Sequence, residues 1–215
     1  MWLNRYLAHA GLGSRRSVES LVREGRVVIN GSTVTAPAVA VKPGDVVCCD
    51  GTAVAPESTV RVWRYHKPAG LLCSNRDPSG HATIFQKLPA NLGRVISVGR
   101  LDLASEGLLL LTNDGTLARR LELPRCAHER HYRVRVHPVI EECALEALRG
   151  GTTIKGIRYR PCEVTHLRSS RSNSWLHVVL REGKNREIRR LLGAHGYQVN
   201  RLIRTAYAGI TLDGL

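Results

Sequence analysis

Apolar residues near the start of the chain recur at helical spacing. Leu3 and Leu7 belong to an i, i+3, i+4, i+7 series that predicts a helix over residues 3–10. Glycines interrupt the series, and Ser14 then follows as a favourable N-cap for a second helix ending at Gly25. The sequence therefore predicts a helical hairpin at the start of the chain.

The two predicted helices lead into short apolar segments separated by turn residues. Residues 26–29 and 32–35 flank Asn30-Gly31, a pair typical of a tight hairpin turn, and residues 46–49 form a further apolar segment. We expect a compact domain over residues 1–50, followed by a small, polar linker over residues 51–59.

Residues 60–215 carry a different pattern, with more strands than helices. Strands interleaved with occasional helices at irregular spacing favour an α+β domain with a mostly antiparallel sheet. We expect strands over residues 60–66, 96–99, 107–111, 132–136, 175–180 and 198–203, and helices over residues 117–123, 141–148 and 186–195.

Charge narrows the range of partners. The 215-residue chain has a formal net charge of +14, and most of its basic residues are arginines, which bind phosphate bidentately. The apolar run Leu108–Leu111 is far shorter than the roughly 20 residues that a membrane span requires. No secretory signal is expected, and six cysteines without zinc-binding spacing fit reduced thiols. We therefore expect a cytoplasmic protein that binds a polyanion such as RNA.

The first domain contains the segment LNRYLAHAGLGSRRSVESLVREGRVVING. Arg15 and Arg16 open its second helix, where free backbone N–H groups favour phosphate, and Arg23 and Arg26 follow further along. Solvated arginines on an ordinary helical surface are the alternative. The segment resembles the S4 RNA-binding domain, which implies that these four arginines contact RNA.

The second informative block is VGRLDLASEGLLLLTNDG, residues 98–115. It places Asp102 between two apolar strands, where burial of an unpaired carboxylate would cost several kcal/mol, of the order of 2–7 for a polar group. A turn-capping aspartate would explain this position, and so would a functional carboxylate with an arginine partner.

The block resembles the signature of the pseudouridine synthases of the RsuA/RluB group. Three further segments match this family in order: YHKPAGLLCSNRDPSGHATIF, ERHYRVRV and REGKNREIRRLLGAHGYQVNRLIR. The DPSG and NREIRR parts look closer to the RluB branch, which acts on large-subunit rRNA. The resemblance implies isomerisation of a uridine in ribosomal RNA. The uridine would be flipped out of an RNA stem-loop, and the partner would be free rRNA or a pre-ribosomal particle.

The resemblance also implies roles for individual residues. Asp102 matches the nucleophilic aspartate, Tyr132 the tyrosine that stacks on the base, and Arg189 the arginine that pairs with the aspartate. Ile188 matches an apolar residue that packs on the base, and Arg100 is placed to contact the flipped nucleotide. The remaining substrate-binding candidates, at the start of the last predicted helix, are Lys184, Asn185 and Arg186.

Structural explanations compete with each of these roles. Tyr132 lies in an alternating strand, where it could be a core residue, and Arg189 could belong to a solvated basic helix face. The alternative function is a non-catalytic S4-type RNA-binding or ribosome-assembly protein. No cofactor and no metal are implied, and we expect a monomer.

Overall fold

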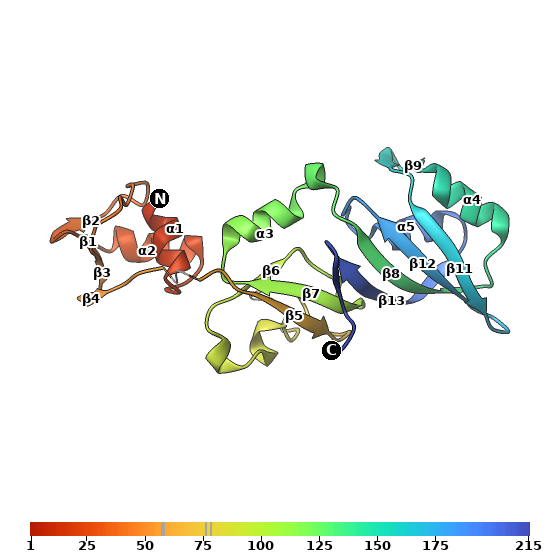
Figure 1. Cartoon of the computed structure of the whole chain (residues 1–215), viewed down its shortest axis with the longest axis horizontal. Coiled ribbons are helices and arrows are strands. Elements are labelled where there is room, and N and C mark those ends of the chain that lie inside the picture. Colours follow the sequence, from red (N-terminus) through yellow and green to blue (C-terminus); the bar gives the residue numbers. More distant parts are fainter. Residues whose placement is uncertain (57–58, 76, 78) are drawn as a thin grey trace. The chain divides into compact units, whose positions relative to one another are not determined.

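The computed structural model describes residues 1–56, 59–75, 77 and 79–215 (Figure 1). Two compact units are present. The first contains residues 1–62, 89–96 and 112–115, and the second contains residues 63–88, 97–111 and 116–215. Among the described residues, no helix has the length and apolar character required to cross a membrane.

The helices of the first unit form where the apolar spacing predicts them. They are α1 (Leu3–His9) and α2 (Arg15–Arg23). The Ser14 hydroxyl caps α2, accepting a hydrogen bond of 3.1 Å from the backbone N–H of Ser17. Leu3 and Leu7 of α1 pack with α2 residues in one buried cluster. The predicted helical hairpin is therefore confirmed.

A small antiparallel sheet completes the first unit. Its strands are β1 (Val27–Ile29), β2 (Ser32–Val34), β3 (Val47–Cys49) and β4 (Thr52–Ala53), in the order β2-β1-β3-β4. The tight turn at Asn30-Gly31 is present, with positive φ at both residues. Strand β4 lies within the stretch that we expected to be a linker, and Glu57 and Ser58 of that stretch lie outside the described residues.

The second unit is organised by a mixed, mostly antiparallel sheet in the order β11-β12-β8-β13-β7-β5, with β14 and β6 at its side. The α+β class is confirmed. The strands are β5 (Val62–Lys67), β6 (Ile96–Val98), β7 (Glu106–Thr112), β8 (Arg130–His137), β11 (Glu163–Ser169), β12 (Ser174–Leu180), β13 (Gln198–Tyr207) and β14 (Ile210–Thr211). The helices are α3 (Gly115–Glu122), α4 (Glu142–Gly150) and α5 (Glu187–Ala194).

Besides β4, the sequence pattern missed four strands of the second unit. Strand β11 has mostly exposed side chains, so it lacks the apolar alternation that marks a half-buried strand. The hairpin of β9 (Thr152–Ile154) and β10 (Ile157–Tyr159) and the strand β14 were missed for a different reason. These strands are too short to show a period.

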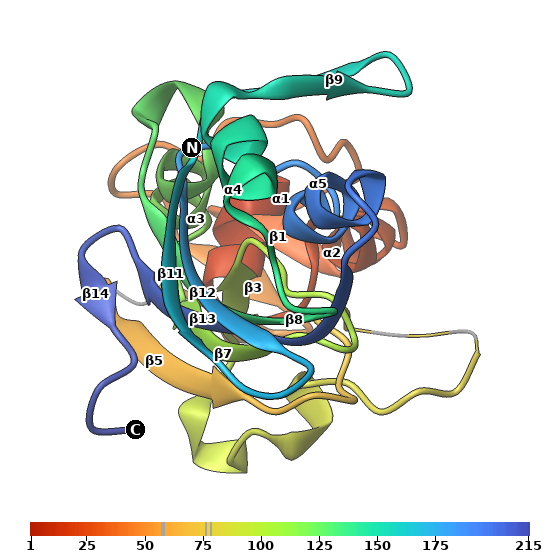
Figure 2. The ribbon, with the colours of Figure 1, turned by 90° about the vertical axis from the view of Figure 1, so that its right-hand side faces the viewer.

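The sheet has two chemically different faces. Along β8, Arg130, Tyr132, Val134 and Val136 are buried, and the residues between them are half-buried or exposed. Helix α4 contacts β11 and helix α5 contacts β13, and both helices lie to one side of the strands (Figure 2). The buried face carries the core and the cavity described next.

Candidate active site

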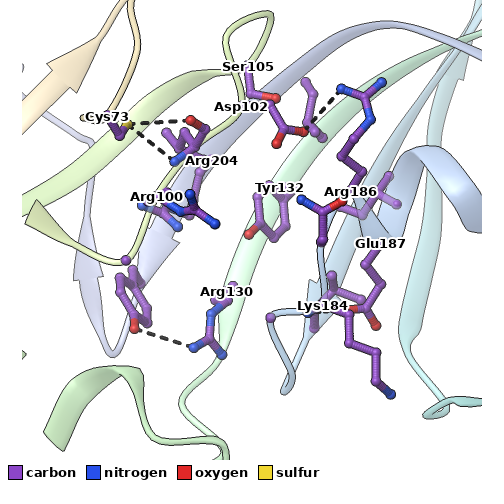
Figure 3. A pocket seen from close by; sticks show the side chains of 18 of the residues that line it. Cys73, Arg100, Asp102, Ser105, Arg130, Tyr132, Lys184, Arg186, Glu187 and Arg204 are labelled. Atoms are coloured by element: carbon purple, nitrogen blue, oxygen red, sulfur yellow. Dashed lines mark hydrogen bonds and ion pairs between the residues drawn. The ribbon is translucent and has the colours of Figure 1, made fainter. Parts of the chain in front are cut away.

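A cavity of about 810 Å³ opens on the buried face of the sheet (Figure 3). Its wall includes the loop between β6 and β7, the ends of β8 and β13, and the segment that joins β12 to α5. Residues 72–74, together with Glu122 and Pro124, also line it. Of the predicted site residues, it brings together Arg100, Asp102, Tyr132, Lys184, Asn185, Arg186 and Ile188.

Asp102 lies in the β6–β7 loop, with its side chain 28% exposed. The backbone of this loop is held by Lys67, which is fully buried at the end of β5. The Lys67 ammonium donates hydrogen bonds to the carbonyl oxygens of Asp102 (3.2 Å), Leu103 (3.4 Å) and Ser105 (2.7 Å). Burial lowers the pKa of Lys67, although the nearby Cys73, Asp102 and Glu106 act in the opposite direction.

Cys73 holds the other side of the same loop. Its buried thiol donates to the carbonyl of Leu101 and accepts from the backbone N–H of Leu101, both at 3.4 Å. Our sequence reasoning missed both Lys67 and Cys73. A lysine at the end of an alternating strand is usually solvated, and only contacts about 35 residues away in sequence show its role.

Gly107 fixes where β7 begins relative to β13. Its φ is +107°, and a Cβ atom here would lie 2.3 Å from the carbonyl oxygen of Arg204. The two strands pair in parallel at this point, with Arg204 opposite Gly107. Glycine is therefore required for the close approach that sets the Asp102 loop against β13.

Tyr132 and Ile188 supply the apolar part of the wall. Tyr132 is 8% exposed and lies between Asp102 and Arg130 in the cavity (Figure 3). Ile188, in the first turn of α5, is 5% exposed. An aromatic ring and an aliphatic side chain beside a carboxylate form a space suited to a planar base.

The structure changes the expected partner of Asp102. We expected Arg189, but among the described residues Arg186 makes the ion pair, at 3.8 Å. The Arg189 guanidinium instead donates to the backbone carbonyls of Val199 (2.9 Å) and Ala104 (3.3 Å). Burial lowers the pKa of Arg189, as does Arg186, while Asp102 raises it. Arg189 thus fixes the loop after Asp102, because α5 directs it toward those carbonyls.

Lys184 and Asn185 are already engaged by neighbouring side chains. The Lys184 ammonium binds the Glu182 carboxylate at 2.7 Å and also donates to the carbonyl of Arg158. The Asn185 side-chain oxygen accepts from Arg190 at 3.2 Å. Of the three predicted phosphate ligands at the start of α5, Arg186 has the most exposed charge, with its side chain 51% exposed.

Two carboxyl groups meet in the wall of the cavity. Glu187 is 3% exposed, and its Oε2 atom accepts from the backbone N–H of Lys184 at 3.1 Å. Burial, together with the adjacent Glu182, raises the pKa of Glu187 to about 8. Burial also acts to raise the pKa of Glu182, but hydrogen bonds from Lys184, from the Arg160 backbone and from Glu187 lower it. Burial thus favours the protonated form of Glu187, while hydrogen bonds favour the ionised form of Glu182.

The four arginines predicted in the S4-like segment differ in their contacts. Arg15 and Arg16 are exposed at the start of α2. Arg23 is ion-paired with Glu19 at 3.4 Å, and Arg26 pairs with Asp50 at 2.6 Å. The hydrogen bonds that the Arg26 guanidinium donates to Asp50 and Glu24 raise its pKa. Arg15 and Arg16 are thus more open to an added anion.

Comparisons with known proteins match both parts of the chain. Residues 1–47 match the S4 domain, and residues 61–194 match the family described as RNA pseudouridylate synthase. A protein named "Uncharacterized RNA pseudouridine synthase" from Rickettsia felis is 43% identical over 213 residues, which cover 99% of this chain and 92% of that protein. "Ribosomal large subunit pseudouridine synthase B" from Salmonella typhi is 42% identical over 219 residues, covering 98% and 74%.

A solved structure shows the same fold. A crystal structure of a pseudouridylate synthase aligns with a TM-score of 0.67 and 26% sequence identity, covering 98% of this chain and 90% of that one. Fold and cavity together define an isomerase that acts on RNA. The chain belongs to the RNA pseudouridylate synthase family, and its first part is an S4 domain.

Proposed function

We propose that the protein converts a uridine of large-subunit ribosomal RNA to pseudouridine, with Asp102 as the nucleophile. The substrate class rests on relatives named for the large ribosomal subunit, including those from Salmonella typhi and Pasteurella multocida. The observation that carries the chemistry is the placement of Asp102, Tyr132 and Ile188 in one cavity.

The reaction breaks the bond between ribose and the uracil nitrogen and joins the ribose to a ring carbon, which loses its proton. A carboxylate nucleophile is needed whether it attacks the ring or the sugar. The carboxylate of Asp102 has the Arg186 cation at 3.8 Å and is 28% exposed, so an entering nucleotide can reach it. In this proposal Tyr132 stacks on the extruded base and takes part in proton transfer.

Lys67, Cys73 and Arg189 position the nucleophile through its backbone. Together they donate hydrogen bonds to carbonyl groups of residues 101–105, on both sides of Asp102. Preorganisation of this kind reduces the entropy lost when the reacting groups align. The exposed Arg15 and Arg16 of the S4 domain and Arg100 of the cavity wall contact RNA phosphates.

The test uses an rRNA transcript labelled with tritium on the uracil carbon that becomes bonded to ribose. Wild type releases tritium, whereas Asp102→Asn keeps the shape of the side chain and loses the nucleophile. We expect this variant to lose activity by at least about a thousandfold, the scale for removal of an essential catalytic group, with unchanged RNA affinity. Asp114→Asn is the matched control, a single aspartate changed outside the cavity.

Three results would contradict the proposal. Full tritium release by Asp102→Asn would show that Asp102 is not the nucleophile. Absence of release by wild type from the large-subunit transcript, with release from a small-subunit transcript, would refute the substrate class. Absence of release from either transcript, with tight binding to both, would favour the non-catalytic RNA-binding alternative.

A further inference from the structure

The face of the sheet opposite the cavity carries a row of basic side chains around a tryptophan. Arg168 of β11 pairs in register with Trp175 of β12, Trp175 with Arg135 of β8, and Arg135 with Arg201 of β13. Cross-strand partners point to the same side of a sheet, about 5 Å apart. The four side chains therefore form a continuous row that crosses four strands, here called the outer row.

Alternation along the strands separates the outer row from the active site. Tyr132, Leu202 and Arg204 line the cavity, and they alternate with Arg133, Arg201 and Ile203 on the other face. Helices α4 and α5 lie to one side of the sheet (Figure 2). Arg133, Arg135, Arg168 and Arg201 are all exposed. A ligand on this face does not enter the catalytic cavity.

The charges on this face are unequally matched. Arg201 pairs with Glu106, and Glu129 and Glu163 both pair with Arg181. In the part of the chain that the structure describes, Arg133, Arg135 and Arg168 have no ion-pair partner. Three arginines of this face thus lack an acidic partner among the described residues, while Glu106, Glu129 and Glu163 are each engaged by another arginine. Several arginines without acidic partners on one face suit a ligand with many negative charges, a polyanion, better than a peptide with one or two acidic side chains.

The aromatic side chain adds a second kind of recognition. The Arg133 guanidinium lies 5.4 Å from the centre of the Trp175 ring, a cation–π contact. Arginine planes and aromatic rings are the surfaces on which unpaired bases stack. A sheet face that presents both, with free arginines beside them, matches the chemistry of single-stranded RNA more closely than that of a membrane or a duplex.

We infer that the outer row, with Arg133, is a second RNA-binding surface that holds an unpaired segment of the substrate RNA outside the catalytic cavity. The inference rests on the proposed function for the identity of that RNA. Four strands at a spacing of about 5 Å span roughly 15 Å, a width at which four-stranded sheets stack two or three bases. Trp175 and Arg133 stack on bases, and Arg135 and Arg168 contact phosphates.

The experiment uses the full chain and a fluorescein-labelled dodecamer of uridine as the probe. Fluorescence anisotropy gives the affinity of wild type, Trp175→Ala and the double variant Arg135→Gln/Arg168→Gln. Trp175→Ala should bind about tenfold more weakly, the lower range for loss of one base stack. The double variant should lower the slope of log affinity against log salt by about 1.4, since each phosphate contact on a single strand contributes about 0.7.

The matched control is Arg119→Gln/Arg120→Gln, which removes the same charge from exposed positions on α3. A dodecamer with 4-thiouridine adds a site-specific measurement, because its photo-crosslinks should map to peptides of β8 and β12. Unfolding temperature checks that each variant is folded. With the rRNA transcript, the double variant should raise KM several-fold at an unchanged kcat, since these residues do not line the cavity.

Three binding results would overturn the inference, and one kinetic result would do so as well. The binding results are equal loss of affinity in the α3 control, crosslinks that avoid β8 and β12, and wild-type affinity in Trp175→Ala and the double variant. A fall in kcat rather than a rise in KM would assign the row a structural role and would also refute it. Wild-type tritium release is measured independently, so failure of this inference is distinguishable from failure of the proposed function.

Discussion

Replacement of Glu187 by glutamine should remove a pH dependence of stability. Glutamine keeps the size and the hydrogen-bond acceptor of a protonated glutamate but cannot ionise. Glu187 is 3% exposed, and its pKa is raised from 4.5 to about 8. Between pH 4.5 and about 8, the folded protein therefore binds more protons at Glu187 than the unfolded chain does. The free energy of unfolding of wild type therefore falls as pH rises through this window.

The magnitude follows from the pKa. At about 1.4 kcal/mol per pKa unit, the interval from 4.5 to about 8 corresponds to roughly 5 kcal/mol at most. Glu182 does not cancel this term within the window, because its lowered pKa places its own titration below about 4.5. Between pH 5 and 9, we expect wild type to lose about 2–4 kcal/mol of stability relative to Glu187→Gln.

The assay is urea unfolding of both proteins at several pH values from about 5 to 9. Glu146→Gln, an exposed glutamate on α4, is the control and should follow wild type. Glu187 begins the helix that follows Arg186, so wild-type activity should also fall above pH of about 8 and persist in Glu187→Gln. A constant difference in unfolding free energy across the pH range would refute a buried, protonated Glu187.

Three other outcomes test the remaining structural arguments. Lys67→Met should destabilise the protein by about 2–4 kcal/mol, because several charge-assisted hydrogen bonds are lost, whereas exposed Lys87→Met should have no effect in the same urea titration. Gly107→Ala should cost more than about 3 kcal/mol, and more than Gly70→Ala, which has positive φ but open space; equal costs would contradict the close approach. Wild-type affinity for rRNA should fall steeply with salt, and a flat response would exclude phosphate contacts as its main source.

Local sequence patterns were sufficient to predict the elements that are stabilised by neighbouring residues in the chain. The helices of the S4 domain follow from apolar spacing and the Ser14 cap, and the Asn30-Gly31 turn follows from its residue types. Strand β8 was predicted from the alternation of residue types over 132–136, and the structure buries every second side chain along it. Strand β11 was missed because its partner β12, rather than its own apolar residues, holds it in the sheet.

The sequence by itself determined a basic chain with a helical RNA-binding segment, an α+β domain and a carboxylate at Asp102 between two apolar strands. The tertiary structure decided which groups surround that carboxylate. Arg186 rather than Arg189 became its ion-pair partner, and Lys67 and Cys73 came to hold its loop. These contacts join residues far apart in the chain, and a partly buried carboxylate is stable only where the whole fold supplies its partners.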